Sequence, residues 1–137
     1  MSKHFHCIIH AKPGVTNSTV KGTSPLTLET SLASENVFKC SFEDVVANFE
    51  SLPRMFLEPD GSFVWVIQSN TTRFQLDGLL VDNGTNLISV ELKGACDEAT
   101  LEQVLTAVGW PEQEVVFQLV QQGVCIDQLD FRELFLL

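Results

Sequence analysis

Two acidic residues and a lysine stand on neighbouring segments that both alternate like β-strands. Asp77 lies within residues 73–80, and Glu91 and Lys93 lie within residues 88–94. Successive side chains of a strand point to opposite faces, so Glu91 and Lys93 share a face, opposite the apolar side chains of their strand. One Asp, one Glu and one Lys gathered in this way are the residue types that a magnesium-dependent site for cleaving phosphodiesters needs.

A hairpin turn centred on Gly84 is expected to bring these two strands side by side. Their apolar faces match only in an even register, and a loop of three or five residues sets Asp77 directly opposite Glu91. The same register places Gln75 opposite Lys93. Directly opposed residues have Cβ atoms roughly 4.5–5.5 Å apart. Like charges at that distance repel each other, so the arrangement predicts a cation, Mg²⁺ or Mn²⁺, between the two carboxylates.

Length and composition describe one acidic domain. The chain has 137 residues, of which 45% are hydrophobic, enough to bury one core. Its formal net charge is −10, with only eight Lys and Arg. This balance disfavours nucleic acid as a partner, because nucleic-acid binding depends largely on basic side chains that contact phosphates. It favours a basic protein partner, and it leaves open whether the chain forms a homo-oligomer.

The sequence also indicates a cellular compartment. No apolar run approaches the roughly 20 residues of a membrane span, so no membrane partner is expected. Residues 1–6 lack the apolar core of a signal peptide. We therefore expect a cytoplasmic protein whose four scattered cysteines are free thiols, mostly buried, because no Cys-x-x-Cys spacing is present.

The remaining pattern predicts an α+β fold in a single domain, residues 1–137. Residues 1–40 form a β-rich N-terminal extension, residues 41–120 the core and residues 121–137 a short C-terminal helix. From residue 41 the expected order is helix, three strands, helix and strand. The expected elements are a strand at 3–11, a helix at 41–52, strands at 62–68, 73–80 and 88–94, a helix at 98–109 and a strand at 114–120. Residues 15–36 fit either one or two short strands or a loose excursion.

Three histidines lie on the expected first strand. His4, His6 and His10 share one face of it, and a His-x-His pair can bind zinc. No third or fourth ligand at tetrahedral spacing is evident. The preferred interpretation is therefore an exposed edge strand.

The element order, with Asp77 on the second core strand and Glu91-Leu92-Lys93 on the third, resembles the PD-(D/E)XK nuclease superfamily. The resemblance covers about residues 41–120. It implies a restriction-endonuclease-like mixed β-sheet flanked by helices, in which Asp77 and Glu91 hold one or two Mg²⁺ or Mn²⁺ ions. Lys93 would orient the attacking water or neutralise the phosphate. Many members add an acid from the first helix; Glu43 and Glu50 are the candidates here, and Glu50 is preferred because it neighbours the apolar stripe of that helix.

Other features point away from that family. Leu76 stands where the family motif has proline, and the literal Pro59-Asp60 pair lies in an expected turn. No basic surface accompanies the motif. A degenerate member that does not cleave is one alternative. The other is a non-catalytic acidic interaction protein, a binding module or toxin-neutralising partner without enzymatic activity.

Overall fold

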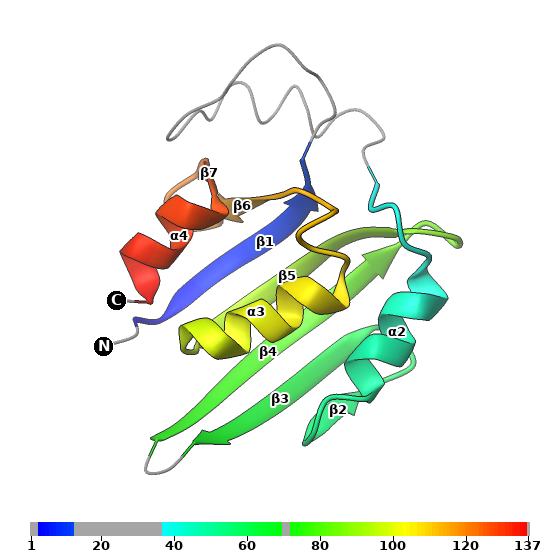
Figure 1. Ribbon diagram of the computed structural model, residues 1–137, viewed down its shortest axis with the longest axis horizontal. Helices are drawn as coiled ribbons and strands as arrows, with labels where there is room; N and C mark the ends of the chain where they lie inside the picture. Colours follow the sequence, from blue (N-terminus) through cyan, green and yellow to red (C-terminus); the bar gives the residue numbers. More distant parts are fainter. Residues whose placement is uncertain (1–2, 13–36, 70–71, 137) are drawn as a thin grey trace.

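Strands of one antiparallel sheet and three helices make up the part of the chain that the computed structural model describes, residues 3–12, 37–69 and 72–136 (Figure 1). The strands are β1 (Phe5–Ala11), β2 (Met55–Leu57), β3 (Ser62–Ser69), β4 (Thr72–Asp82), β5 (Leu87–Ala95), β6 (Val115–Leu119) and β7 (Val124–Asp127). The helices are α2 (Phe42–Glu50), α3 (Glu98–Ala107) and α4 (Gln128–Phe135). Across the sheet the strands stand in the order β2-β3-β4-β5-β1-β6-β7.

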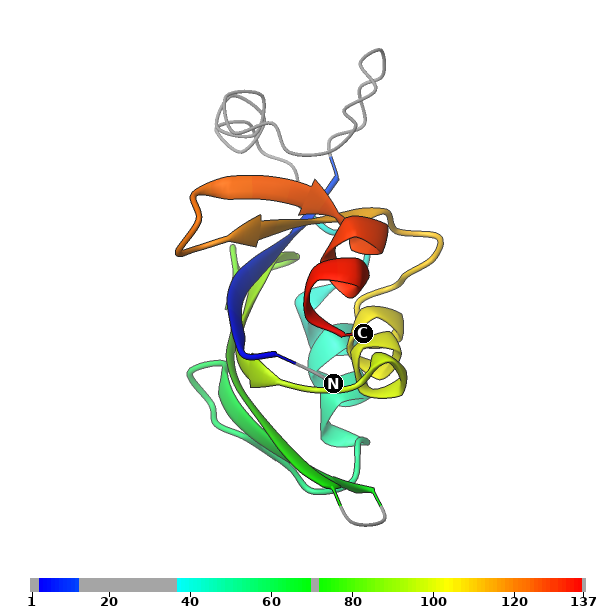
Figure 2. The same ribbon diagram turned by 90° about the vertical axis from the view of Figure 1, so that its left-hand side faces the viewer.

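The three helices form one layer on the same face of the sheet, which curves around them (Figure 2). Alternate side chains of the strands point to this concave side and pack against the apolar stripe of each helix. The largest buried side chains of this core include Trp65, Phe38, Phe49, Phe117, Phe131 and Ile9. We call the convex side of the sheet the open face, because no described helix covers it; its outward side chains include His6, Asp77, Glu91 and Lys93.

Each helix begins at a side-chain cap that its local sequence supplies. The Ser41 hydroxyl accepts a hydrogen bond of 3.1 Å from the Asp44 amide, which confirms the expected start of the first helix. Asp97 caps α3 in the same way, and Asp127 caps α4. These caps satisfy backbone N–H groups that have no partner within the helix.

The α+β fold class is confirmed, whereas the expected mixed sheet is wrong because of β1. Helix α3 connects β5 to β6, and these two strands run parallel to each other. They are not neighbours, however, since β1 lies between them and pairs antiparallel with both. The segment assigned to an N-terminal extension thus supplies an inner strand. The interpretation of the histidine strand as an edge strand is therefore wrong, and the restriction-endonuclease-like arrangement is not confirmed.

Two short strands were not expected from the sequence. Strand β2 has three residues and β7 has four, too few for alternation to distinguish them from loops. The expectations for residues 15–36 lie outside the described residues. Among the described helices, none is long and apolar enough to cross a membrane.

The four cysteines are free thiols, as expected. Cys7, Cys96 and Cys125 are buried, and burial raises the pKa of Cys96 and of Cys125 to about 12. Burial also raises the pKa of Cys7 well above its ordinary value, with the nearby Cys96 and Glu91 adding to the effect. These side chains are therefore protonated near neutral pH, which makes them poor nucleophiles.

Candidate functional site

The pairing of β4 with β5 differs from the expected register by two residues. Asp77 lies opposite Lys93, and Glu91 lies opposite Leu79. The expected direct opposition of Asp77 and Glu91 is therefore wrong, as is that of Gln75 and Lys93. The even register is kept, so the apolar faces match as the alternation requires. Asp77 and Glu91 become diagonal neighbours, for which a Cα separation of roughly 7–8 Å is typical.

The turn between the two strands explains this shift. Asp82 pairs with Leu87 across a four-residue loop, but the next pair is Val81 with Ser89, so β5 contains one extra residue at a bulge. Side chains of the loop hold it in place, because the Asp82 carboxylate accepts from the Gly84 amide at 2.8 Å. The Asn83 side chain accepts from two further loop amides at 3.0 and 2.9 Å. The bulge restores the parity that a four-residue loop alone would break.

On the open face the predicted metal ligands already have hydrogen-bonding neighbours. The Glu91 carboxylate lies 2.5 Å from His6 Nε2. The Asp77 carboxylate accepts a hydrogen bond of 3.1 Å from the Gln75 amide group. Lys93 stands between His6 and Asp77 in one row across three strands. The three residues of the motif therefore share a face, but each carboxylate has a different neighbour.

A hollow of about 460 Å³ lies beside this row. Asp77 and Lys93 line it, whereas Glu91 does not; its other polar lining residues are His4, His6, Gln75 and Gln121. Within the described part of the chain, no group of three or more His, Cys, Asp or Glu side chains could hold a metal ion. The assignment of Asp77 and Glu91 as ligands of Mg²⁺ or Mn²⁺ stays a prediction that rests on two carboxylates alone.

Gly78, the neighbour of Asp77, has a packing role. A Cβ atom there would lie 2.2 Å from the Phe63 ring and 2.7 Å from the Glu91 carbonyl oxygen. Glycine is therefore required because Phe63 covers this point of the sheet on the concave side. Packing therefore explains the glycine beside Asp77, and no catalytic role at the open face is needed to account for it.

A second polar pair on the open face involves His10. Its Nε2 atom donates to the Gln118 side-chain oxygen at 2.8 Å, which leaves Nδ1 as an acceptor. Burial lowers the pKa of His10 from its ordinary value of 6.5, and the Gln118 hydrogen bond opposes this effect. His10 is thus mainly neutral at physiological pH.

Glu50, the predicted acid from the first helix, does not join the open-face residues. It belongs to α2, which lies on the concave side, so the sheet separates it from Asp77 and Glu91 on the open face (Figure 2). It lines a hollow of about 250 Å³ together with Glu58. Glu58 was not singled out from the sequence, because only the fold brings residues 42–50 next to residues 57–61.

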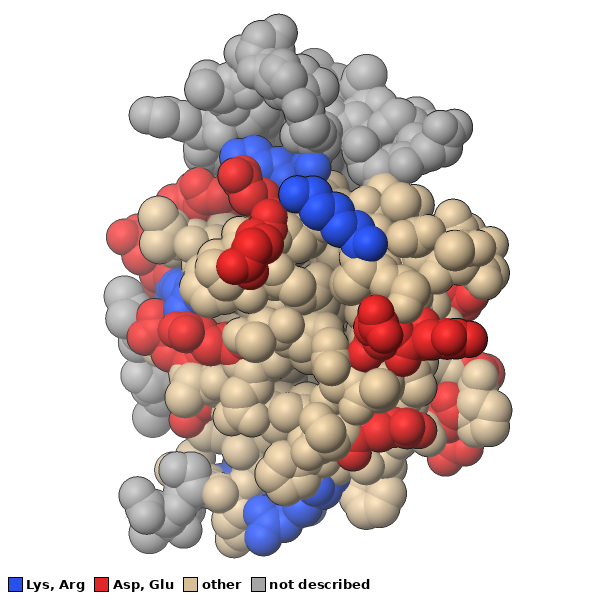
Figure 3. Space-filling view, turned by 45° about the vertical axis from the view of Figure 1, so that its right-hand side comes forward, with Lys and Arg blue, Asp and Glu red and all other residues tan. Residues whose placement is uncertain are grey.

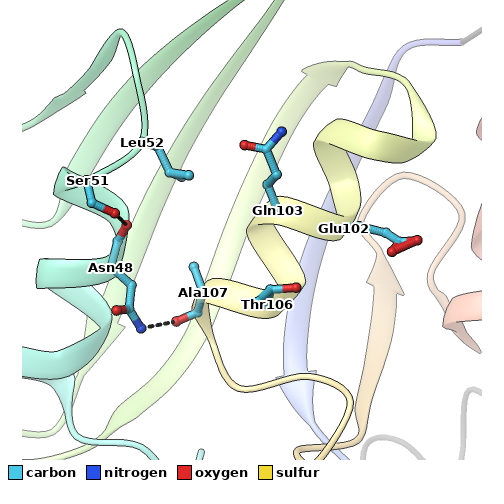
Figure 4. A pocket seen from close by; sticks show the side chains of 7 residues that line it. All are labelled: Asn48, Ser51, Leu52, Glu102, Gln103, Thr106 and Ala107. Carbon is cyan, nitrogen blue, oxygen red and sulfur yellow. Dashed lines mark hydrogen bonds between the residues drawn. The ribbon is translucent and has the colours of Figure 1, made fainter.

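A third hollow, of about 400 Å³, separates α2 from α3 (Figure 4). Uncharged side chains face it, and the Asn48 amide group bridges the two helices by donating to the Ala107 carbonyl at 3.0 Å. Glu102 belongs to its lining but points toward α4, where its carboxylate is 3.5 Å from Arg132. This hollow therefore carries little charge of its own.

The helical layer holds an uneven distribution of charge. Helices α2 and α3, with their caps, contain six acidic residues and no Lys or Arg: Glu43, Asp44, Glu50, Asp97, Glu98 and Glu102. Arg132 pairs with Glu98 and Glu102. Within the described residues, the acids of α2 have no ion-pair partner. Figure 3 shows this side, where carboxylates surround a broad uncharged surface and the few Lys and Arg side chains lie near the top, near the bottom and at the left edge.

Comparison with known proteins gives no further assignment. No protein-family model, curated protein or solved structure matches this chain. The function must therefore be inferred from the chemistry of its own surfaces.

Proposed function

We propose that this chain is a non-catalytic binding module for a cationic protein partner. The observation that carries the proposal is the charge of two adjacent helices, which contain six acidic residues and no basic one. Arg132 of α4 pairs with two of these acids, Glu98 and Glu102, whereas the acids of α2 have no ion-pair partner within the described residues. Such an excess of negative charge attracts cationic partners and raises their association rate. A basic toxin is one partner of this class.

The positions of the motif residues favour binding over catalysis. Glu50 is separated from Asp77 and Glu91 by the sheet, and Glu91 is engaged with His6. A net charge of −10 also repels a phosphodiester, whose approach a nuclease must favour. Binding of a basic protein requires neither that these carboxylates converge nor that the surface attract a phosphate.

The proposal is tested by titrating the full chain with a fluorescent lysine-rich peptide, with a glutamate-rich peptide of equal length as the control. We expect binding of the lysine-rich peptide alone. Its affinity should fall steeply between about 0.01 M and about 1 M salt, since the Debye length shortens from roughly 30 Å to roughly 3 Å. Absence of binding at low salt, or an affinity that salt does not change, would contradict the proposal.

A second candidate is a metal-dependent, nuclease-like site, favoured by one observation. Asp77, Glu91 and Lys93 share the open face, and two of them line the same hollow. In that case Mg²⁺ or Mn²⁺ should bind in calorimetry, and Glu91→Ala should abolish both metal binding and phosphodiester cleavage. No heat of binding at millimolar metal would exclude this candidate.

A further inference from the structure

We propose that the hollow between Glu50 and Glu58 receives one lysine or arginine side chain of the partner. This inference rests on the proposed function and names the contact that would give it specificity. The hollow lies between one side of α2, from Phe42 to Glu50, and the turn between β2 and β3. Its apolar lining consists of Phe42, Val46, Leu57, Pro59 and Gly61.

The size of the hollow selects the kind of ligand. Its volume is about 250 Å³, whereas pockets for drug-sized molecules span roughly 300–1,000 Å³. A single long side chain is therefore a better match than a cofactor or a nucleotide. The apolar walls suit a methylene stem, and the carboxylates suit a cationic head, which is how lysine and arginine bury their stems and keep their charges solvated.

The two carboxylates are available for a partner. Glu50 and Glu58 are both exposed, and within the described residues neither forms an ion pair. By contrast, Asp60 on the same turn is already used, since its carboxylate accepts from the Ser62 hydroxyl at 2.6 Å and from the Ser62 amide at 2.9 Å. These hydrogen bonds lower the pKa of Asp60. The turn thus contains one acid with a structural role, Asp60, and one acid without an ion-pair partner among the described residues, Glu58.

Backbone contacts hold Glu58 in position before any partner arrives. Its amide donates to the Ser62 carbonyl at 2.8 Å, and its carbonyl accepts from the Gly61 amide at 3.0 Å. Gly61 has φ of +94°, and a Cβ atom there would lie 2.4 Å from the Leu80 carbonyl oxygen. Only glycine fits this close approach, so the turn is anchored to β4. A preorganised acceptor loses less entropy when it binds.

The experiment compares two cationic peptides that differ only in the length of the side-chain stem. One is oligolysine, and the other is the same oligomer of 2,4-diaminobutyric acid, which has an equal charge on a stem shorter by two methylenes. Both are titrated into the wild-type chain, into Glu50→Gln/Glu58→Gln, and into Glu112→Gln/Glu133→Gln. The last variant loses the same charge at two exposed positions outside the hollow. Circular dichroism checks that all three proteins are folded.

We expect the wild-type chain and the control variant to prefer oligolysine. In Glu50→Gln/Glu58→Gln the oligolysine affinity should fall about fivefold to tenfold, the effect of two exposed ion pairs, and the preference for the longer stem should disappear. Equal losses in both variants, or no stem preference in the wild type, would overturn the assignment of the hollow while leaving the proposed function standing. If the wild type binds neither peptide, the proposed function itself fails.

Discussion

The two sides of the sheet differ in whether their polar side chains have partners within the protein. On the open face, hydrogen bonds join His6 to Glu91 and His10 to Gln118, so the polar groups satisfy one another. On the helical side, Arg132 pairs with Glu98 and Glu102, but Glu50 and Glu58 have no ion-pair partner within the described residues. The comparison shows that residues whose spacing resembles a catalytic motif can instead form contacts within the sheet. The carboxylates that are available to a partner lie on the other side of the sheet.

The largest effect on stability is expected from a substitution at Gly78 that disrupts its packing against Phe63. Gly78→Val should lower the free energy of unfolding by about 1–3 kcal/mol or more, because the added atoms collide with the Phe63 ring. Urea unfolding followed by circular dichroism measures this change. Wild-type stability in the variant would show that Gly78 is not required for packing and would reopen a functional role for it.

The next effect tests the pairing on the open face. His6→Ala should cost about 1 kcal/mol of unfolding free energy, less than the roughly 1.5–3 kcal/mol of a sheltered charged hydrogen bond, because the Glu91 side chain is 38% exposed. A double-mutant cycle with Glu91→Ala isolates the coupling. A coupling energy of zero would mean that the two side chains do not stabilise each other.

A smaller effect concerns the pH dependence of stability. The pKa of His10 is lowered in the folded chain, so between that pKa and 6.5 the unfolded chain binds more protons. This contribution to stability is complete above pH 6.5 and is lost as the pH falls through that window. The measurement is the difference in unfolding free energy between wild type and His10→Gln across this pH range, which isolates the contribution of His10. A difference independent of pH would contradict this prediction.

The smallest effect is expected on the helical side. Glu50→Gln/Glu58→Gln should change the free energy of unfolding by no more than about 0.5 kcal/mol, as is usual for surface substitutions away from structural contacts. Thermal unfolding of the variant beside His6→Ala provides the comparison. A loss as large as that of His6→Ala would mean that these acids have structural partners.

Much of the fold follows from local pattern, because alternation and capping are properties of short segments. The element order from α2 to β6 was expected except for the short strand β2, and the even register of β4 with β5 was also expected. The position of β1 in the strand order could not be predicted from the sequence. A strand with one open face alternates in the same way whether it lies at an edge of the sheet or between two neighbours. Its seven residues alternate between buried and half-buried side chains, which fits either position.

The candidate site was less predictable, because it depends on the loop length, the bulge and the packing between elements, none of which follows from the spacing of residues along the chain. The four-residue loop and the bulge in β5 opposite Val81 and Asp82 together place Asp77 opposite Lys93 and not opposite Glu91. Only the hydrogen bonds of the turn show why a four-residue loop forms. That Glu58 and Glu50 line one hollow depends on the packing of β2 beside α2. No pattern in the sequence joins these two residues.

The most direct test of the account is a titration of the isotopically labelled chain with oligolysine, followed by the backbone amide resonances. If the helical side binds cations, the shifts should concentrate in α2 and in residues 57–61, while the amides of Asp77, Glu91 and Lys93 stay unchanged. Shifts confined to β4 and β5, or no shift at all, would contradict the account.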